Sequence, residues 1–112
     1  MVETVLYDFL SKNGPVDAYM ERPENAPAEY CLIEKTGSKT ANRLTTSTVA
    51  VQSYAKSLYR AAEINSEIIE LMDTLTAYSD KISGVKLNSD GNFTDVSTKQ
   101  YRYQATFTIT HY

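Results

Sequence analysis

The hydrophobic and polar positions of the chain predict one long amphipathic helix, from Ser57 to about Tyr78. At 100° per residue its apolar side chains fall within an arc of roughly 180°, and polar side chains fill the other side. Ser57 can cap the first turn, because its hydroxyl can accept a hydrogen bond from an early backbone N–H group. An arc this wide predicts a helix that sinks between the sheet and a second element, or that presents its flank to another subunit. The apolar positions are Leu58, Ala61, Ala62, Ile64, Ile68, Ile69, Leu71, Met72 and Leu75.

A β-patterned run from Leu44 to Tyr54 leads into this helix with almost no linker. With a period of two, Val49 and Val51 share one face of the strand, and Ala50 and Gln52 share the other. The strand and the helix that covers it therefore form the central unit of the predicted fold.

The first ten residues predict a shorter helix. It ends at Asn13-Gly14-Pro15, because glycine tolerates a left-handed conformation and proline does not continue a helix. A short strand from Val16 to Met20 follows, and then a loop from Glu21 to Pro27 that contains two prolines. The apolar stripe of the helix consists of Val2, Val5, Leu6, Phe9 and Leu10.

The segment from Tyr30 to Lys35 is almost continuously apolar at its start, which predicts a strand that is covered on both faces at its middle. The next segment, Thr36 to Asn42, consists mainly of small and polar residues. We expect it to be a mobile loop.

Two strands complete the predicted fold. The first runs from Ile82 to Leu87 with Val85 and Leu87 directed inward, and the turn-forming segment Asn88 to Asn92 predicts a reversal or an extended loop after it. The last run alternates an apolar face with a threonine-rich face as far as Tyr112. The apolar face consists of Tyr101, Tyr103, Ala105, Phe107, Ile109 and His111.

The predicted order is therefore α, β, β, β, α, β, β in a single domain that spans residues 1–112. This order predicts an α+β fold, with two helices packed on a mixed, mostly antiparallel sheet of four or five strands. The links between neighbouring strands are short, which favours antiparallel pairs, and the crossover through the long helix leaves room for one parallel pair.

Composition excludes several classes of protein. The net charge is −3 and the basic residues are scattered, so the chain lacks the positive surface of a sequence-specific nucleic-acid-binding protein. No apolar run reaches the ~18 residues that a membrane span needs. The start of the chain lacks the pattern of a signal peptide, so we expect a cytosolic protein. Cys31 is the only cysteine, which excludes an internal disulfide and a cysteine-based zinc site, and we expect it to be a small buried residue.

Few residues indicate catalysis. His111 lies near the end of the chain, where an orienting shell for a catalytic base is rare, so we interpret it as a surface or strand-end histidine. Glu63, Glu67 and Glu70 share one face of the long helix. They could be a solvated acidic face, paired carboxylates or a metal site, or an acidic contact strip for a partner, and the first of these is favoured.

The loop residues Asn88, Asp90, Asn92 and Asp95 loosely resemble a calcium loop, but the glycine is misplaced and no glutamate closes the site. We therefore predict no metal, no cofactor and no enzymatic activity. Nine tyrosines are many for this length. They suit sheet packing, and alternatively some of them, such as Tyr101 and Tyr103, belong to an assembly surface.

The whole chain resembles the small tail-completion proteins of long-tailed bacteriophages and prophages, which include tail terminators and head–tail joining proteins and are often labelled minor capsid proteins. The resemblance lies in the opening helix from Val2 to Leu10, the link containing prolines into Tyr30 to Lys35, the strand-to-helix segment from Val49 to Glu63, and the ending from Thr98 to Tyr112.

This resemblance implies a virion structural protein rather than an enzyme. Such proteins form a ring, commonly a hexamer, that caps the tail tube and offers a docking surface to the head–tail connector protein. It implies a location in the virion, at the tail end or head–tail junction, and in the host cytoplasm during assembly. By analogy, the loops from Thr36 to Asn42 and from Asn88 to Thr98, which includes Asp90 and Asn92, are expected to contact the ring or the tail tube protein.

A ring needs two different and complementary patches. We hypothesise that the strip of Glu63, Glu67 and Glu70, or the sheet edge with Tyr101 and Tyr103, contacts a basic patch on the neighbouring copy. That patch includes Lys35, Lys39 and Arg43. The alternative is a small non-enzymatic adaptor or inhibitor, encoded by a mobile element, that binds one partner through its sheet edge.

Overall fold

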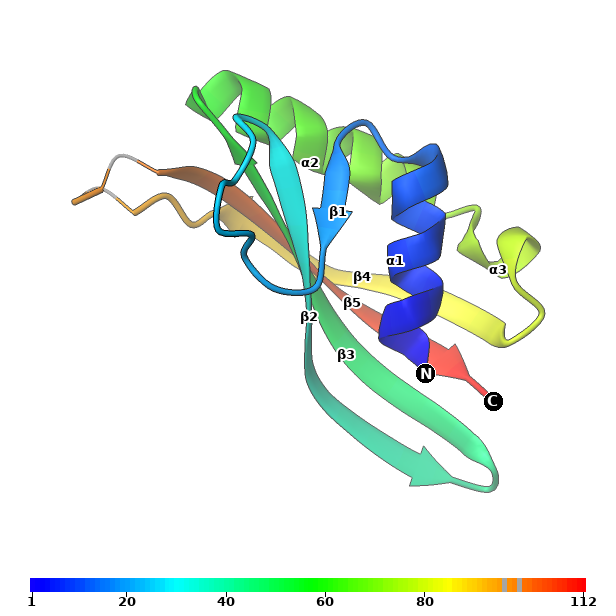
Figure 1. The fold of residues 1–112 in the computed structure, drawn as a ribbon. Coiled ribbons are helices and arrows are strands. Elements are labelled where there is room, and N and C mark those ends of the chain that lie inside the picture. Colours follow the sequence, from blue (N-terminus) through cyan, green and yellow to red (C-terminus); the bar gives the residue numbers. More distant parts are fainter. Residues whose placement is uncertain (96, 99) are drawn as a thin grey trace.

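The structure is a computed structural model that describes residues 1–95, 97–98 and 100–112. Helices cover one face of a five-stranded sheet, as Figure 1 shows. The elements are α1 (Val2–Asn13), β1 (Asp17–Tyr19), β2 (Tyr30–Ala41), β3 (Leu44–Ala55), α2 (Leu58–Met72), α3 (Leu75–Tyr78), β4 (Ile82–Asn92) and β5 (Tyr101–His111). The predicted α+β class and order of elements are confirmed, with α3 as an additional short helix.

The strands lie in the order β1-β2-β3-β5-β4. Within the described ranges, β1 and β2 form the one parallel strand pair, and the three other pairs are antiparallel. The one parallel pair is therefore not at the crossover through α2. That crossover places β4 on the far side of β5 from β3, so the two strands it joins are not neighbours.

The core lies between the sheet and the helices α1 and α2. Val49 and Val51 of β3 are fully buried on this face, beside Phe107 and Ala105 of β5. The predicted alternation of both strands is confirmed. We call the opposite face of the sheet the outer face.

Gly14 ends α1 for a different reason from the one expected. Its φ is −77°, which any residue adopts. A Cβ atom at this position would lie 2.5 Å from the carbonyl oxygen of Leu10. The Gly14 backbone N–H group donates a hydrogen bond to this same oxygen at 2.8 Å, which holds the oxygen too close for a Cβ atom. Gly14 is therefore required for space.

The predicted cap of the long helix is confirmed, but its predicted end is wrong. The Ser57 hydroxyl accepts a hydrogen bond from the Arg60 backbone N–H group at 3.1 Å. The helix α2 ends at Met72 instead of near Tyr78. Just after this end, the Thr74 hydroxyl donates a hydrogen bond to the Leu71 carbonyl oxygen at 2.7 Å. Such a side-chain bond competes with the backbone hydrogen bonds that would continue the helix.

The predicted mobile loop from Thr36 to Asn42 is wrong, because β2 continues to Ala41 and pairs with β3. A two-residue turn at Asn42 and Arg43 joins the strands, with φ of 52° and 68°. Positive φ at both central residues is typical of a type I′ turn, which fits the twist of a hairpin. The pairing partner, rather than the composition of the segment, makes it a strand.

The reversal predicted between Asn88 and Asn92 is also wrong, since β4 extends to Asn92. The chain reverses in the segment after it, before β5 begins at Tyr101. Two irregularities in the pairing with β5, at residues 83 and 88, let β4 follow its partner. Leu87 points to the helix-covered face, as predicted, but it is 40% exposed because it lies at this edge of the sheet.

A row of aromatic rings crosses one end of the outer face. Tyr19 meets Tyr30 edge-on with centroids 6.0 Å apart, and Tyr30 stacks on Tyr54 at 4.7 Å. The Arg102 guanidinium lies 5.9 Å from the centroid of the Tyr54 ring. Sheet packing therefore explains these three tyrosines.

Candidate interaction surface

The outer half of β2 is the most unusual feature of the surface. Every residue from Glu34 to Ala41 is exposed, in contrast to the largely buried start of the strand. In the part of the chain that is described, the segment lies at the edge of the sheet, because β1 pairs only with Tyr30 to Leu32. We call Glu34–Ala41 the exposed β2 segment.

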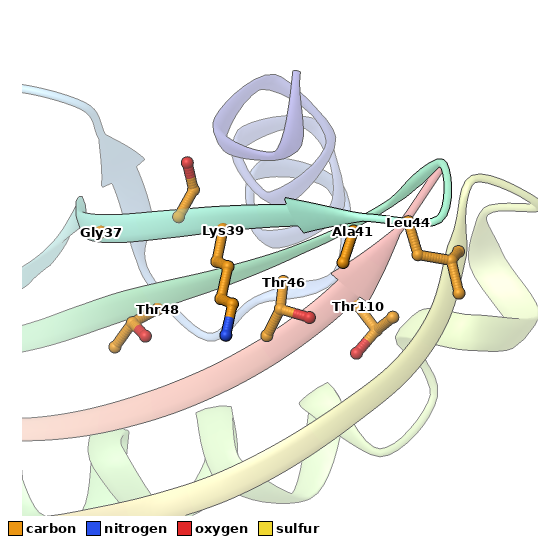
Figure 2. A pocket seen from close by; sticks show the side chains of 8 residues that line it. Gly37, Lys39, Ala41, Leu44, Thr46, Thr48 and Thr110 are labelled. Carbon is orange, nitrogen blue, oxygen red and sulfur yellow. The ribbon is translucent and has the colours of Figure 1, made fainter.

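A shallow hollow of about 720 Å³ lies on the outer face beside this segment. Figure 2 shows the side chains of Lys39, Thr46, Thr48 and Thr110 around it, with Leu44 at the turn end. Of the described residues that line it, Lys39 is the one that carries a charge. Short hydroxyl side chains and open walls suit contact with another macromolecular surface better than enclosure of a small molecule.

The expected basic patch is not continuous. Lys35 lies on the helix-covered face opposite Val49, and its ammonium group is 3.8 Å from a carboxylate oxygen of Glu3 in α1. Lys39 points to the outer face, and Arg43 occupies the hairpin turn. The pairing irregularity between Lys35 and Gly37 changes the alternation, so the two lysines lie on opposite faces.

The expected acidic strip is only partly free. Glu63 accepts a hydrogen bond from Arg60 at 3.1 Å, whereas Glu67 and Glu70 are exposed on α2. The Arg60 guanidinium also donates hydrogen bonds of 2.7 and 3.2 Å to the Glu29 carboxylate. These hydrogen bonds lower the pKa of the Glu29 carboxyl. This pair fixes the end of the loop before β2 against α2.

The residues that resemble a calcium loop have other partners. Asn88 donates to the Thr108 hydroxyl at 2.7 Å, and Asn92 accepts from Thr94. Hydrogen bonds from Ser97 lower the pKa of the Asp95 carboxyl. Among the described residues, no three metal-binding side chains are grouped for an ion. Val96, within the predicted contact loop, lies outside the described residues.

Asp90 links two elements. Its carboxylate accepts a hydrogen bond from the side-chain amide of Asn65 at 3.1 Å, although Asp90 itself is exposed. Asn65 is only 3% exposed, and the helical pattern did not single it out because it is polar. This bond fixes α2 against the edge strand β4.

Tyr101 and Tyr103 are half-buried against the core. They lie on the helix-covered face of β5, between β3 and β4, so they are not at a free edge of the sheet. Most of each tyrosine side chain is therefore unavailable to a neighbouring copy.

Sequence reasoning did not find the contact between Ser47 and His111. The Ser47 hydroxyl oxygen lies 2.8 Å from Nε2 of His111, and Nδ1 of the same ring lies 3.4 Å from the Tyr112 carbonyl oxygen. Ser47 has no exposed surface. A substrate cannot reach this hydroxyl, so the pair ties β3 to the end of β5.

No protein-family model and no curated protein matches the sequence. In the part of the chain that is described, no helix is both long and apolar enough to span a membrane. The geometry of the surface therefore provides the basis for a functional proposal.

Proposed function

We propose that this chain is a structural protein of a long-tailed phage virion, which forms a ring that caps the tail tube or joins the tail to the head. The observation that supports this most strongly is the exposed β2 segment. Within the described residues it has a strand partner on one side only, and its residues are exposed. Natural proteins usually shorten, cover or pair such an edge, because an unpaired strand attracts other chains.

The distribution of polar side chains supports the same proposal. The outer face at the hairpin carries Thr46, Thr48 and Thr110 without a helix over it, and the hollow there is open. A half-exposed polar sheet face suits contact with a large and partly hydrated partner. The resemblance of the sequence to tail-completion proteins names the assembly in which such a partner would be found.

Deletion of the gene in its phage, followed by electron microscopy of the products, tests the proposal. Complete heads and tails that remain unjoined would support a joining role, and tails of abnormal length would support a terminator role. Normal virions at normal yield would contradict both. Complementation with the intact gene in trans is the control for effects on neighbouring genes.

Native mass spectrometry across protein and salt concentration separates this proposal from the adaptor alternative. A ring-forming protein gives a closed oligomer, with six copies as the expected number. An adaptor that binds one partner through the same edge remains a monomer at all concentrations. The measurement is repeated with purified tail tubes, because a ring can form on its tube.

A further inference from the structure

In the described residues, both edges of the sheet are unpaired over part or all of their length. On one side β1 covers only the first part of β2, and on the other side β4 has β5 as its single neighbour. Among the described residues, neither the exposed β2 segment nor the outer edge of β4 has a strand beside it. The molecule therefore presents two different free edges at opposite ends of one sheet.

The hairpin geometry identifies the backbone groups that are free on β2. In a two-residue type I′ hairpin, the residues that flank the turn, Ala41 and Leu44, form a hydrogen-bonded pair. Such pairs alternate with pairs whose N–H and C=O groups point away from the partner strand. The backbone groups of Thr40 and Ser38 therefore point outward, toward the free edge.

Strand direction makes these two edges compatible. The strand β2 is antiparallel to β3, β3 to β5, and β5 to β4, so β2 and β4 run in opposite directions. In a cyclic ring every copy has the same orientation along the axis. When β2 of one copy lies beside β4 of the next, the two strands are antiparallel, as they are within the sheet.

The side chains beside β4 also suit a neighbour. Leu87 on β4 is 40% exposed, Leu58 on α2 is 39% exposed, and Val85 and Ile69 are only partly buried. Ile69 follows Asn65 by one helical turn, on the flank that the Asn65–Asp90 bond directs toward β4. This apolar flank explains the wide arc of the helix, since part of it is left uncovered in one copy.

Charge favours the same arrangement. Asp90 belongs to the β4 edge and Lys35 to the β2 edge, and both point to the helix-covered face of the sheet. A sheet that continues from one copy to the next keeps this face on the same side. Lys35 and Asp90 would then lie on one surface with opposite charge.

We propose that the exposed β2 segment of one copy adds as an antiparallel strand to β4 of the next copy, so that the sheet continues around the ring. The occupant of each free edge is thus a second copy of this chain. The inference depends on the proposed ring, and it names the two surfaces that meet there.

Cross-linking between two single-cysteine-addition variants tests the contact. Ser38→Cys and Leu87→Cys place thiols on the helix-covered face of the two edges at nearly the same level of the sheet, and Cys31 is only 1% exposed, so it contributes little background. The full-length variants are mixed under conditions in which native mass shows rings and are treated with a short bismaleimide. A linked dimer in the mixture, at least tenfold above either variant alone, is the expected result.

A matched control replaces Leu87→Cys by Ser11→Cys, which is exposed on α1 and away from β4. Linking of Ser38→Cys to itself would show pairing of β2 with β2 and would overturn the inference. Rings that form without any link between residues 38 and 87 would overturn it too, while the proposed function would stand. If neither rings nor links form, with or without tail tubes, both proposals fail together.

Discussion

Cys31 is a side chain whose chemistry is determined by burial. It is 1% exposed, and burial, with a smaller effect of Asp17, raises the pKa of its thiol from 9.0 to about 12. A thiol with so high a pKa has little thiolate at neutral pH and reacts slowly. Its role in the fold is to fill space between β2 and the helices.

The raised pKa predicts how stability changes in alkaline solution. Because the folded pKa exceeds the unfolded one, the thiol contributes stability that is complete below pH 9 and is lost as the pH rises toward about 12. Urea denaturation at pH 7 and pH 10.5 should show a smaller loss for Cys31→Ala than for the natural chain. Equal losses would contradict the prediction. Ellman's reagent should label the natural chain only after it unfolds.

Two stacked tyrosines offer a matched comparison. The Tyr30 hydroxyl is buried without a hydrogen-bond partner among the described residues, and burial raises its pKa. The Tyr54 hydroxyl donates to Gln52 at 3.0 Å. Tyr30→Phe should leave the free energy of unfolding unchanged or raise it by about 1 kcal/mol, whereas Tyr54→Phe should lower it by about 1 kcal/mol. Chemical denaturation measures both, and a larger loss for Tyr30→Phe would contradict the assignment.

Among the elements, the β2–β3 hairpin has a turn that is not optimal. Arg43 adopts a φ of 68°, which costs a residue with a side chain roughly 1 kcal/mol or more relative to glycine. Arg43→Gly should therefore raise the free energy of unfolding by about 1 kcal/mol. Arg43→Ala removes the same charge but keeps Cβ, so it should give no such gain in a parallel denaturation experiment.

Thr40 tests the free edge of the same hairpin. Thr40→Pro removes a backbone N–H group that points away from β3, and prolines are tolerated at such edge positions. We expect the variant to remain folded by circular dichroism, with a change in Tm of a few degrees at most, and to lose ring formation. Thr40→Ala keeps the N–H group and should form rings. Rings of Thr40→Pro would show that this edge is not used.

Sequence alone predicted most elements, because their residues follow periods that burial on one face imposes. The apolar stripes of α1, α2 and β5 are examples, and the Ser57 cap follows from local chemistry. The outer half of β2 and the end of β4 could not be predicted in this way. Their residues face water, so pairing with β3 and β5 keeps them extended, and pairing is not a local property.

The candidate site was harder to predict than the fold for the same reason. Lys35 and Lys39 were expected together, but one irregularity in the pairing separates them. Asn65 and Ser47 were not considered, although both are buried and each bonds a residue far along the chain. Such contacts depend on register, which the spacing of residues along one strand does not give.

For the whole molecule, the acidic surface of α2 lies apart from both sheet edges. Glu67 and Glu70 are exposed and point away from the sheet, whereas Glu63 is paired with Arg60. If rings form through the edges, these two carboxylates remain outside the contact between copies. They are then available to the tail tube or to the head connector.

Charge reversal on α2 separates ring formation from tail joining. Glu67→Lys with Glu70→Lys should reduce tail joining at low salt, with partial recovery as salt screens the charges, while ring formation by native mass stays unchanged. Infectious yield after complementation of the deletion measures joining. Glu21→Lys with Glu24→Lys, at two exposed residues between β1 and β2, is the control for net charge. Unchanged joining would show that the two carboxylates are only solvated.

The position of β5 also has a consequence for how the chain folds. This strand lies between β3 and β4, and its pairing joins Thr45 to His111 across most of the chain. The β2–β3 hairpin can form early because its contacts are local, but β3 has an open second edge until the end of the chain is available. Folding is therefore expected to be slow, and during synthesis the nascent chain exposes a long strand that other chains can bind. Chains that are cut short before Tyr101 should aggregate rather than form a smaller version of the same domain.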